Sequence, residues 1–261
     1  MKVALVSLNQ VWENKVVNLQ TCCEYVKKGQ LIGADLIIFP EMTLTGFSMN
    51  LSKTAEDQRN SESVNFFSSL SQEFGIAIIF GVVFQGKPKA SNNAVFVNTN
   101  GAVLDIYAKI HPFSLSGENN QFTAGNKLCI VAFESFNIGI TICYDLRFPE
   151  LYSALAKRCD LIVNIASWPA SRIEHWDTLL KARAIENQVF MIGVNRTGVD
   201  DCQIAYERSS TVIAPDGVIM QPSFSEKDMS IFEITKEQAE TIKMNFSTTQ
   251  DRIPSFYKTI L

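Results

Sequence analysis

The sequence predicts a layered α/β sandwich with mixed β-sheets, and three observations support this fold class. Short apolar runs rich in Val and Ile alternate with amphipathic helical stretches at both ends of the chain. An Asn-Gly pair near the middle separates two strand-like runs, which indicates an antiparallel hairpin. Sheets that mix parallel and antiparallel strands and carry helices on their outer faces pack into such layers.

The first third of the chain predicts alternating strands and helices. The run "KVALVSL" (2–8) indicates a strand, residues 18–34 an amphipathic helix, and "DLIIFP" (35–40) a buried strand. A second helix over residues 62–75 ends in a glycine that suits the C-cap position. It leads into the apolar strand "IAIIFGVVF" (76–84).

The middle of the chain predicts an antiparallel section. The runs "NAVFVNT" (93–99) and "AVLDIYAK" (102–109) flank the Asn-Gly turn, so we expect them to pair as a hairpin. An irregular loop over residues 110–126 follows. Two further strands are expected at 128–133 and 138–143.

The alternating pattern then returns. We expect a helix over "PELYSALAKRC" (149–159), a strand at 160–166, a helix at 175–188 and a strand at 189–195. The last third adds three apolar runs, at residues 209–215, 218–223 and 230–235. A helix is expected from Lys236, and the tail from about residue 246 onward has no clear periodicity.

Length and composition restrict the class of protein. With 261 residues, 46% of them hydrophobic, the chain can bury a large core, and we expect one domain over residues 1–261. The net charge is −4 and no basic cluster offsets it, so no nucleic acid partner is expected. No run of about 18 apolar residues and no signal peptide is found, so we expect a soluble, cytoplasmic protein without a membrane partner.

The cysteines and histidines indicate neither a disulfide framework nor a metal site. Six cysteines are few for this length, and none forms a C-x-x-C pair, so most are expected to be reduced thiols. The two histidines, His111 and His175, lie outside any H-x-x-x-H arrangement. The six cysteines are Cys22, Cys23, Cys129, Cys143, Cys159 and Cys202.

Polar residues follow several of the predicted strands, where a ligand crevice forms in open α/β sheets. The strand at 35–40 leads to Glu41, the strand at 102–109 ends at Lys109, and the strand at 138–143 ends at Cys143. A carboxylate near a thiol can accept its proton, and an ammonium favours the thiolate and stabilises an oxyanion. These three side chains therefore predict a cysteine nucleophile that needs no histidine.

Simpler interpretations of the same residues remain open at this point. A cysteine that ends a buried strand is more often an inert core residue than a nucleophile. Glu41 is also compatible with a helix cap, and Lys109 with a solvated strand end. Asp145 and Arg147, directly behind Cys143, either pair with each other or hold the turn. The start of the next helix supplies positive potential that can lower a thiol pKa.

Four segments, in this order and at these separations, resemble the nitrilase (carbon–nitrogen hydrolase) superfamily. They are "IIFPEMTLTGF", "YAKIHPF", "ITICYDLRFPEL" and "ARAIENQVFMIGVNR". Within the superfamily, "TGFSMN", "CYDLRFP" and "SWPASRIEHWDTLLKARAIENQ" are most similar to the omega-amidase branch, which deaminates 2-oxoglutaramate and related 2-oxo acid ω-amides. The resemblance covers nearly the whole chain.

The resemblance implies a four-layer α-β-β-α sandwich with two mixed sheets, commonly assembled as a homodimer or higher homo-oligomer. It implies that Glu41 is the general base, Lys109 the oxyanion stabiliser and Cys143 the nucleophile. It also implies a second catalytic glutamate, for which "SGENNQFTAG" supplies Glu118. The backbone N–H of Tyr144 is the expected second oxyanion donor. No metal or organic cofactor is needed, and the tail from about residue 246 is a candidate for the dimer interface.

The expected substrate is a small linear amide with a carboxylate at its far end. The strand at 160–166 leads into "SWPASR", so we expect Trp168 to form an apolar wall and Arg172 to pair with that carboxylate. Arg147 is the alternative cation. The competing interpretations are that Trp168 is a core aromatic and that Arg172 is a solvated loop residue. Two other functions stay open: a nitrilase-type hydrolase of a nitrile, carbamoyl or other amide substrate, and a non-catalytic scaffold relative.

Overall fold

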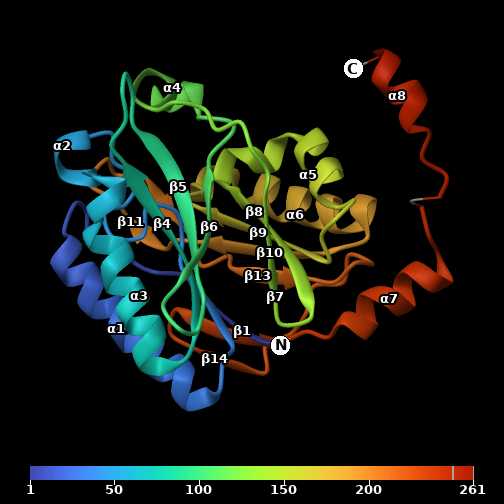
Figure 1. Cartoon of the computed structure of the whole chain (residues 1–261), viewed down its shortest axis with the longest axis horizontal. Helices are drawn as coiled ribbons and strands as arrows, with labels where there is room; N and C mark the ends of the chain where they lie inside the picture. The colour runs from blue at the N-terminus through green and yellow to red at the C-terminus, as the bar shows by residue number, and fades with distance from the viewer. Residues whose placement is uncertain (249, 261) are drawn as a thin grey trace.

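The computed structural model describes residues 1–248 and 250–260, and it is a four-layer α-β-β-α sandwich (Figure 1). This architecture confirms the expected fold class. The larger sheet has the strand order β14-β15-β1-β2-β4-β5-β6, with β3 paired to β4, and the smaller has the order β13-β10-β9-β8-β7. A separate two-stranded hairpin, β11-β12, completes the strands of the described residues.

The strands are short, and most match the apolar runs of the sequence. In the larger sheet they are β1 (Lys2–Val6), β2 (Leu36–Ile38), β3 (Ala55–Glu56), β4 (Ala77–Phe84), β5 (Ser91–Val97), β6 (Val103–Ala108), β14 (Phe224–Glu226) and β15 (Met229–Glu233). In the smaller sheet and the hairpin they are β7 (Cys129–Phe133), β8 (Phe136–Ile142), β9 (Leu161–Ala166), β10 (Phe190–Asn195), β13 (Thr211–Ile213), β11 (Gly198–Val199) and β12 (Ala205–Tyr206).

Two pairs of helices form the outer layers. Helices α1 (Lys15–Ile32) and α3 (Glu62–Phe74) cover the larger sheet, and α5 (Pro149–Leu155) and α6 (Ile173–Asn187) cover the smaller one (Figure 1). The remaining helical segments are short or lie near the C-terminus: α2 (Leu51–Thr54), α4 (Glu118–Gln121), α7 (Lys236–Asn245), α8 (Pro254–Ile260) and four 3₁₀ turns at Gln58–Asn60, Ser114–Ser116, Cys143–Arg147 and Ala170–Arg172.

Alternation along the strands separates the layers. In β1, Val3 and Leu5 point into the core between the sheets, whereas Ala4 and Val6 pack with the helices on the outer face. This is the period of two that a strand imposes on its side chains. Both faces of the central strands are buried, which explains why their sequences are continuously apolar.

Strand directions bring the polar strand ends to one edge of the sandwich. Strands β2 and β4 are parallel, and β6 runs in the same direction as β4 because each is antiparallel to β5. In the smaller sheet, β8, β9 and β10 are parallel to one another. The residues that follow β2, β6, β8 and β9 therefore lie at the same edge of the sandwich.

Several predicted elements differ from the structure. The run 218–223 is not a strand: Val218 and Ile219 are more than half exposed, and Ile219 forms only an isolated bridge with Ile213, close to a proline that cannot donate to a ladder. Helix α6 begins at Ile173 rather than residue 175, and α5 ends at Leu155 rather than residue 159. The hairpin β11-β12, strand β14 and helix α8 were not predicted, because each is too short for a periodic pattern.

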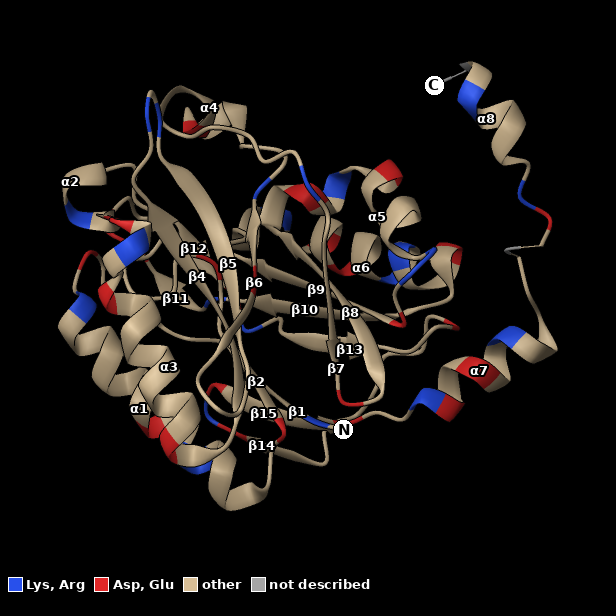
Figure 2. Cartoon of the chain, viewed as in Figure 1, with Lys and Arg blue, Asp and Glu red and all other residues tan. Residues whose placement is uncertain are grey.

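The C-terminal segment stands apart from the sandwich (Figure 1). Arg252 links it to the outer helices of the smaller sheet, donating to Ser153 Oγ at 2.7 Å and to the Glu186 carbonyl at 2.8 Å. Large apolar side chains of this segment are exposed, including Phe246 at 71% and Phe256 at 56%. Acidic and basic residues are interspersed along the chain in Figure 2. Within residues 1–248 and 250–260, the helices all fall short of the length and apolar character that crossing a bilayer requires.

Candidate active site

Glu41 lies in a turn that follows β2, and the surrounding backbone fixes this turn. The side-chain amide of Gln10 donates to the carbonyl oxygens of Glu41, Met42 and Thr43 at 3.0–3.2 Å. Gly81 packs directly against the turn, and its carbonyl accepts a hydrogen bond from the Thr43 N–H at 3.0 Å. Met42 has a φ of 45°, in the left-handed region. The Glu41 backbone is therefore held from several sides.

The carboxylate of Glu41 is fully buried and accepts three hydrogen bonds. Its Oε1 accepts from Lys109 Nζ at 2.9 Å and from Asn92 Nδ2 at 2.8 Å. Its Oε2 accepts from the backbone N–H of Ser167 at 2.9 Å, across the interface between the two sheets. These donors satisfy a buried negative charge that would otherwise be costly.

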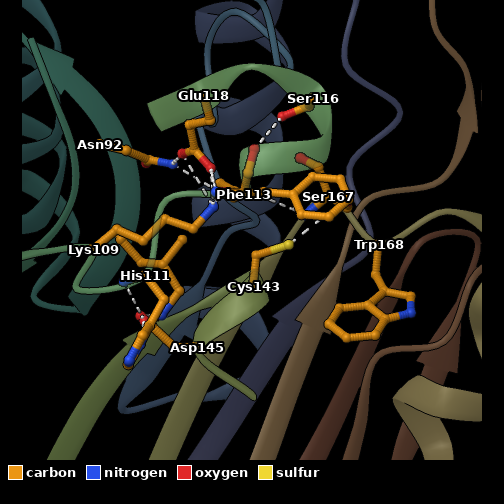
Figure 3. Close-up of polar contacts among 12 residues, drawn as sticks. Asn92, Lys109, His111, Phe113, Ser116, Glu118, Cys143, Asp145, Ser167 and Trp168 are labelled. Atoms are coloured by element: carbon orange, nitrogen blue, oxygen red, sulfur yellow. Dashed lines mark hydrogen bonds and ion pairs between the residues drawn. The ribbon is translucent and has the colours of Figure 1, made fainter. Parts of the chain in front are cut away.

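Lys109, directly after β6, joins Glu41 to a second buried carboxylate. Its Nζ lies 2.8 Å from Glu118 Oε2 and 3.1 Å from Glu118 Oε1 (Figure 3). Burial alone lowers the pKa of Lys109, but Glu41 and Glu118 more than offset this, so the pKa lies above its ordinary value. Lys109 is therefore an ammonium at neutral pH. The same group lies 5.4 Å from the ring centroid of Phe47, a residue of the cavity described below.

Cys143 occupies a sharp turn immediately after β8. Its φ of 46° lies in the left-handed region, which is uncommon for a residue other than glycine. Asp145 closes the turn, because its Oδ2 accepts from the Ile142 N–H at 3.0 Å and from the Tyr107 hydroxyl at 2.7 Å. Asp145 also contacts His111 Nδ1 at 2.8 Å. Asp145 therefore holds the turn, and its hydrogen-bond partners are these groups rather than Arg147.

The environment of Cys143 raises the pKa of its thiol. Burial raises its pKa well above the ordinary value, Glu41 raises it further, and Lys109 and a contact with the Ser167 carbonyl lower it. The net direction is upward, because burial and Glu41 outweigh the groups that lower the pKa. Helix α5 begins only at Pro149, whereas Glu41 acts on the thiol directly. A thiol with a raised pKa near the Glu41 carboxylate suits proton transfer at the moment of attack.

A cavity of about 260 Å³ opens in front of Cys143. Its lining includes Cys143, Ser167 and residues from the loop that joins β11 to β12. Much of its wall is aromatic or apolar and is formed by Trp12, Phe47, Met49, Phe113, Trp168 and Tyr206. Concave, mostly apolar sites with a few polar groups are typical of small-molecule binding.

All four residues expected to contact substrate line this cavity: Tyr144, Arg147, Trp168 and Arg172. The Arg147 guanidinium lies 4.7 Å from the Trp168 ring centroid, and that of Arg172 lies 5.6 Å from the Phe113 ring centroid. Trp168 is 2% exposed and also packs on Trp176, so it belongs to both the core and the cavity wall. In the part of the chain that the structure describes, neither arginine forms an ion pair with a carboxylate.

Two residues of the network were not identified from the sequence. Asn92 lies in β5, and its backbone carbonyl accepts from the Lys109 N–H at 2.8 Å, so a paired hairpin with its register would have placed it beside Lys109. Gln10 carried no comparable signal, because its contacts with the Glu41 turn arise only from tertiary packing. Across residues 1–248 and 250–260, no group of three His, Cys, Asp or Glu side chains is arranged to hold a metal ion.

Comparison with known proteins agrees with this geometry. Residues 2–244 match the model of the carbon–nitrogen hydrolase family. The chain is 34% identical over 220 residues to the omega-amidase YafV of Escherichia coli K12, covering 84% of each protein. It is 30% identical over 255 residues to the 2-oxoglutaramate amidase of Paenarthrobacter nicotinovorans, covering 93% of this chain and 85% of that relative.

A solved structure supports the same assignment. The CN-hydrolase superfamily protein of Xanthomonas campestris, which carries an arsenic adduct in its active site, superposes with a TM-score of 0.89 at 27% identity over 97% of each chain. The family model spans nearly the whole sequence, and the fold agrees throughout. The chain therefore belongs to the carbon–nitrogen hydrolase family of the nitrilase superfamily and is an enzyme that hydrolyses amides.

Proposed function

We propose that the enzyme is an omega-amidase that hydrolyses 2-oxoglutaramate or a related 2-oxo acid ω-amide to the carboxylate and ammonia. The observation that carries this proposal is a buried pair of Glu41 and Lys109 whose charges act on Cys143, which lines a cavity that also contains two arginines. The names of the relatives, omega-amidase and 2-oxoglutaramate amidase, support the substrate class.

In the proposed reaction, Glu41 takes the proton of Cys143 as the sulfur attacks the amide carbonyl carbon. The carbonyl oxygen becomes an oxyanion, which accepts hydrogen bonds from Lys109 and from the Tyr144 backbone N–H. The carbon–nitrogen bond then breaks, and the nitrogen takes the proton from Glu41 and leaves as ammonia. Cys143 and the acyl group remain joined as a thioester.

The second half-reaction reuses the same carboxylate. Glu41 removes a proton from a water molecule as its oxygen attacks the thioester carbonyl, and Lys109 again faces the oxyanion. The carbon–sulfur bond breaks, the sulfur regains its proton from Glu41, and the carboxylate product leaves. Glu118 acts as a positioning group, because it holds the Lys109 ammonium through both of its oxygens.

Recognition of the far end of the substrate is assigned to the arginine side of the cavity. A 2-oxo acid ω-amide ends in a carboxylate, for which a guanidinium is a suitable partner. Arg172 is the proposed partner and Arg147 the alternative, since Arg147 already lies 3.2 Å from His175 Nδ1 through its Nη2 atom. Trp168 forms the wall along the short carbon chain.

A substrate panel tests the proposal. Ammonia release is measured with 2-oxoglutaramate, neutral short-chain amides, ureides and nitriles. The proposal predicts the highest kcat/KM for 2-oxoglutaramate or a close 2-oxo acid ω-amide. A clear preference for a nitrile or ureide would overturn it, and the absence of any turnover would favour a non-catalytic relative.

We also propose that the enzyme is a homodimer or a higher homo-oligomer. Exposed apolar side chains on the C-terminal segment support this assembly, because isolated apolar residues of that size gain free energy when a partner covers them. They include Met244 at 78% exposure, Phe246 and Ile253. Light scattering is expected to give at least twice the chain mass, and a monomer mass at working concentration would contradict the proposal.

A further inference from the structure

We propose that Asn92 is a positioning residue that frees one N–H group of Lys109 for the substrate oxyanion. This inference rests on the proposed amidase reaction and extends it to a residue outside the Glu41, Lys109, Glu118 and Cys143 set. The two buried carboxylates, Glu41 and Glu118, share a small number of hydrogen-bond donors. Figure 3 shows the Asn92 amide beside Glu118 and the Lys109 ammonium.

Three carboxylate oxygens lie within hydrogen-bond distance of Lys109 Nζ in the resting site. An ammonium has three N–H groups. Lys109 Nζ lies 2.9 Å from Glu41 Oε1, 2.8 Å from Glu118 Oε2 and 3.1 Å from Glu118 Oε1. Stabilising an oxyanion requires a fourth partner, so one of these contacts has to be released during the reaction.

Glu118 Oε1 is the oxygen that can release Lys109. Its contact with Lys109 is the longest of the three, and it also accepts from Asn92 Nδ2 at 2.9 Å. Glu118 Oε2 keeps both the Lys109 contact and the Phe113 N–H. When one Lys109 N–H turns to the substrate oxygen, each oxygen of Glu118 therefore still has a donor.

The chemistry of the neighbours fixes the orientation of the Asn92 amide. Asn92 is 2% exposed, and Nδ2 lies 2.8 Å from Glu41 Oε1 and 2.9 Å from Glu118 Oε1. Ionised carboxylate oxygens only accept hydrogen bonds, so the NH₂ group must face them, and its two hydrogens serve one carboxylate each. A neutral donor achieves this without adding a second cation that would compete with Lys109.

Without Asn92, releasing Lys109 would leave Glu118 Oε1 without a donor in a buried site. An unsatisfied buried charged group is costly, so Lys109 would stay on Glu118 and the oxyanion would lose stabilisation. The loss affects the transition state rather than substrate binding. We therefore expect Asn92→Ala to lower kcat by roughly tenfold to a hundredfold, with KM changed by less than about threefold.

Alkylation of Cys143 by iodoacetamide separates this role from a general structural one. Alkylation requires the sulfur but forms no oxyanion, so its rate should be preserved in Asn92→Ala within about threefold. The rate is followed by mass spectrometry of the Cys143 peptide, because Cys202 is exposed and also reacts. Asn93→Ala is the matched control, since Asn93 lies on the same strand and its amide donates only to Ser91 atoms.

The outcomes are distinct. A fall in kcat with preserved alkylation supports the inference, whereas an equal fall in both, or kinetics like those of Asn93→Ala, overturns it. If Asn92→Ala does not fold, Asn92→Ser is used, because one hydroxyl hydrogen cannot serve both carboxylates and the same split is expected. If the wild-type enzyme hydrolyses no amide of the panel, the proposed function fails and this inference fails with it.

Discussion

The backbone N–H of Ser167 donates a hydrogen bond to Glu41 Oε2 at 2.9 Å, although the two residues follow strands of different sheets. The carbonyl of the same Ser167 lies 4.0 Å from Cys143 Sγ. One residue thus contacts both the proposed base and the proposed nucleophile through its backbone. The relative position of these two groups depends on the packing of the two sheets rather than on flexible side chains.

Replacing Glu41 with glutamine should abolish turnover. An amide cannot shuttle protons, and both oxygens of Glu41 face donors, so the new NH₂ group would meet a donor in either orientation. Steady-state ammonia release from Glu41→Gln is compared with that from Glu150→Gln, whose side chain is exposed outside the site. Comparable kcat values for the two variants would exclude Glu41 as the base.

Lys109→Ala should lose both activity and stability. Loss of one oxyanion donor costs about 10²–10³ in kcat in comparable sites. Removal of the ammonium that pairs with both Glu41 and Glu118 leaves two buried carboxylates without this partner, which is expected to cost about 3–5 kcal/mol in the free energy of unfolding. Urea unfolding and kinetics check the two effects separately.

Lys89→Ala is the control for this prediction. Lys89 is exposed, and its ammonium donates to the Asn119 carbonyl at 2.7 Å rather than to a carboxylate. Its replacement should change stability by less than about 0.5 kcal/mol. A Lys109→Ala enzyme with near-normal kcat would show that the oxyanion is stabilised elsewhere.

Gly81→Ala should damage the Glu41 turn. A Cβ atom at Gly81 would lie 2.3 Å from the Met42 N atom and 2.9 Å from the Glu41 Cα atom, so the backbone of the turn would have to shift. We expect a loss of about 1–3 kcal/mol in stability and a lower kcat. In Gly29→Ala the new Cβ would meet Ile76 at an ordinary 3.6 Å, and a gain of up to about 1 kcal/mol is expected within helix α1. If Gly81→Ala and Gly29→Ala changed the stability and kcat equally, the close approach of Gly81 to the Glu41 turn would have no special role.

Arg172→Ala should selectively impair amides that carry a carboxylate. A hydrogen bond to a charged group contributes about 1.5–3 kcal/mol, which corresponds to a loss of roughly tenfold to a hundredfold in kcat/KM for 2-oxoglutaramate. Neutral amides of similar length should be spared. Arg147→Ala is assayed in parallel, and a selective loss there would move the assignment to Arg147. Equal rates of Arg172→Ala and wild type on both classes would remove Arg172 from recognition.

The fold was largely predictable because strands and helices of sufficient length carry periodic patterns. Strand β4 is apolar throughout and buried on both faces, and helix α3 is followed by its C-cap Gly75, whose φ is 65°. The shorter elements had no such pattern. Helix α8 has seven residues and begins at Pro254, a favourable first helical position that does not by itself predict a helix.

The candidate site was predictable where strands deliver polar residues at their ends. It was less predictable where tertiary contacts determine the pKa or the role of a residue. Glu41, Lys109 and Cys143 follow β2, β6 and β8, so each of them is delivered by the end of a strand. The direction of the Cys143 pKa shift could not be derived in this way, because it depends on how deeply the thiol is buried beside Glu41. Asn92 was missed for a related reason, since its role depends on two glutamates that meet only in the folded chain.

The central claim is that Cys143 forms a thioester with the acyl part of an amide. The most direct test is mass spectrometry of enzyme that is acid-quenched during turnover of 2-oxoglutaramate, with Cys202→Ser as the control for the exposed thiol of the same cavity. The account predicts an adduct on the Cys143 peptide equal in mass to the substrate less ammonia, present in Cys202→Ser and absent in an inactive Cys143→Ala. Turnover by Cys143→Ala at a near-normal rate, or an adduct on another residue, would contradict it.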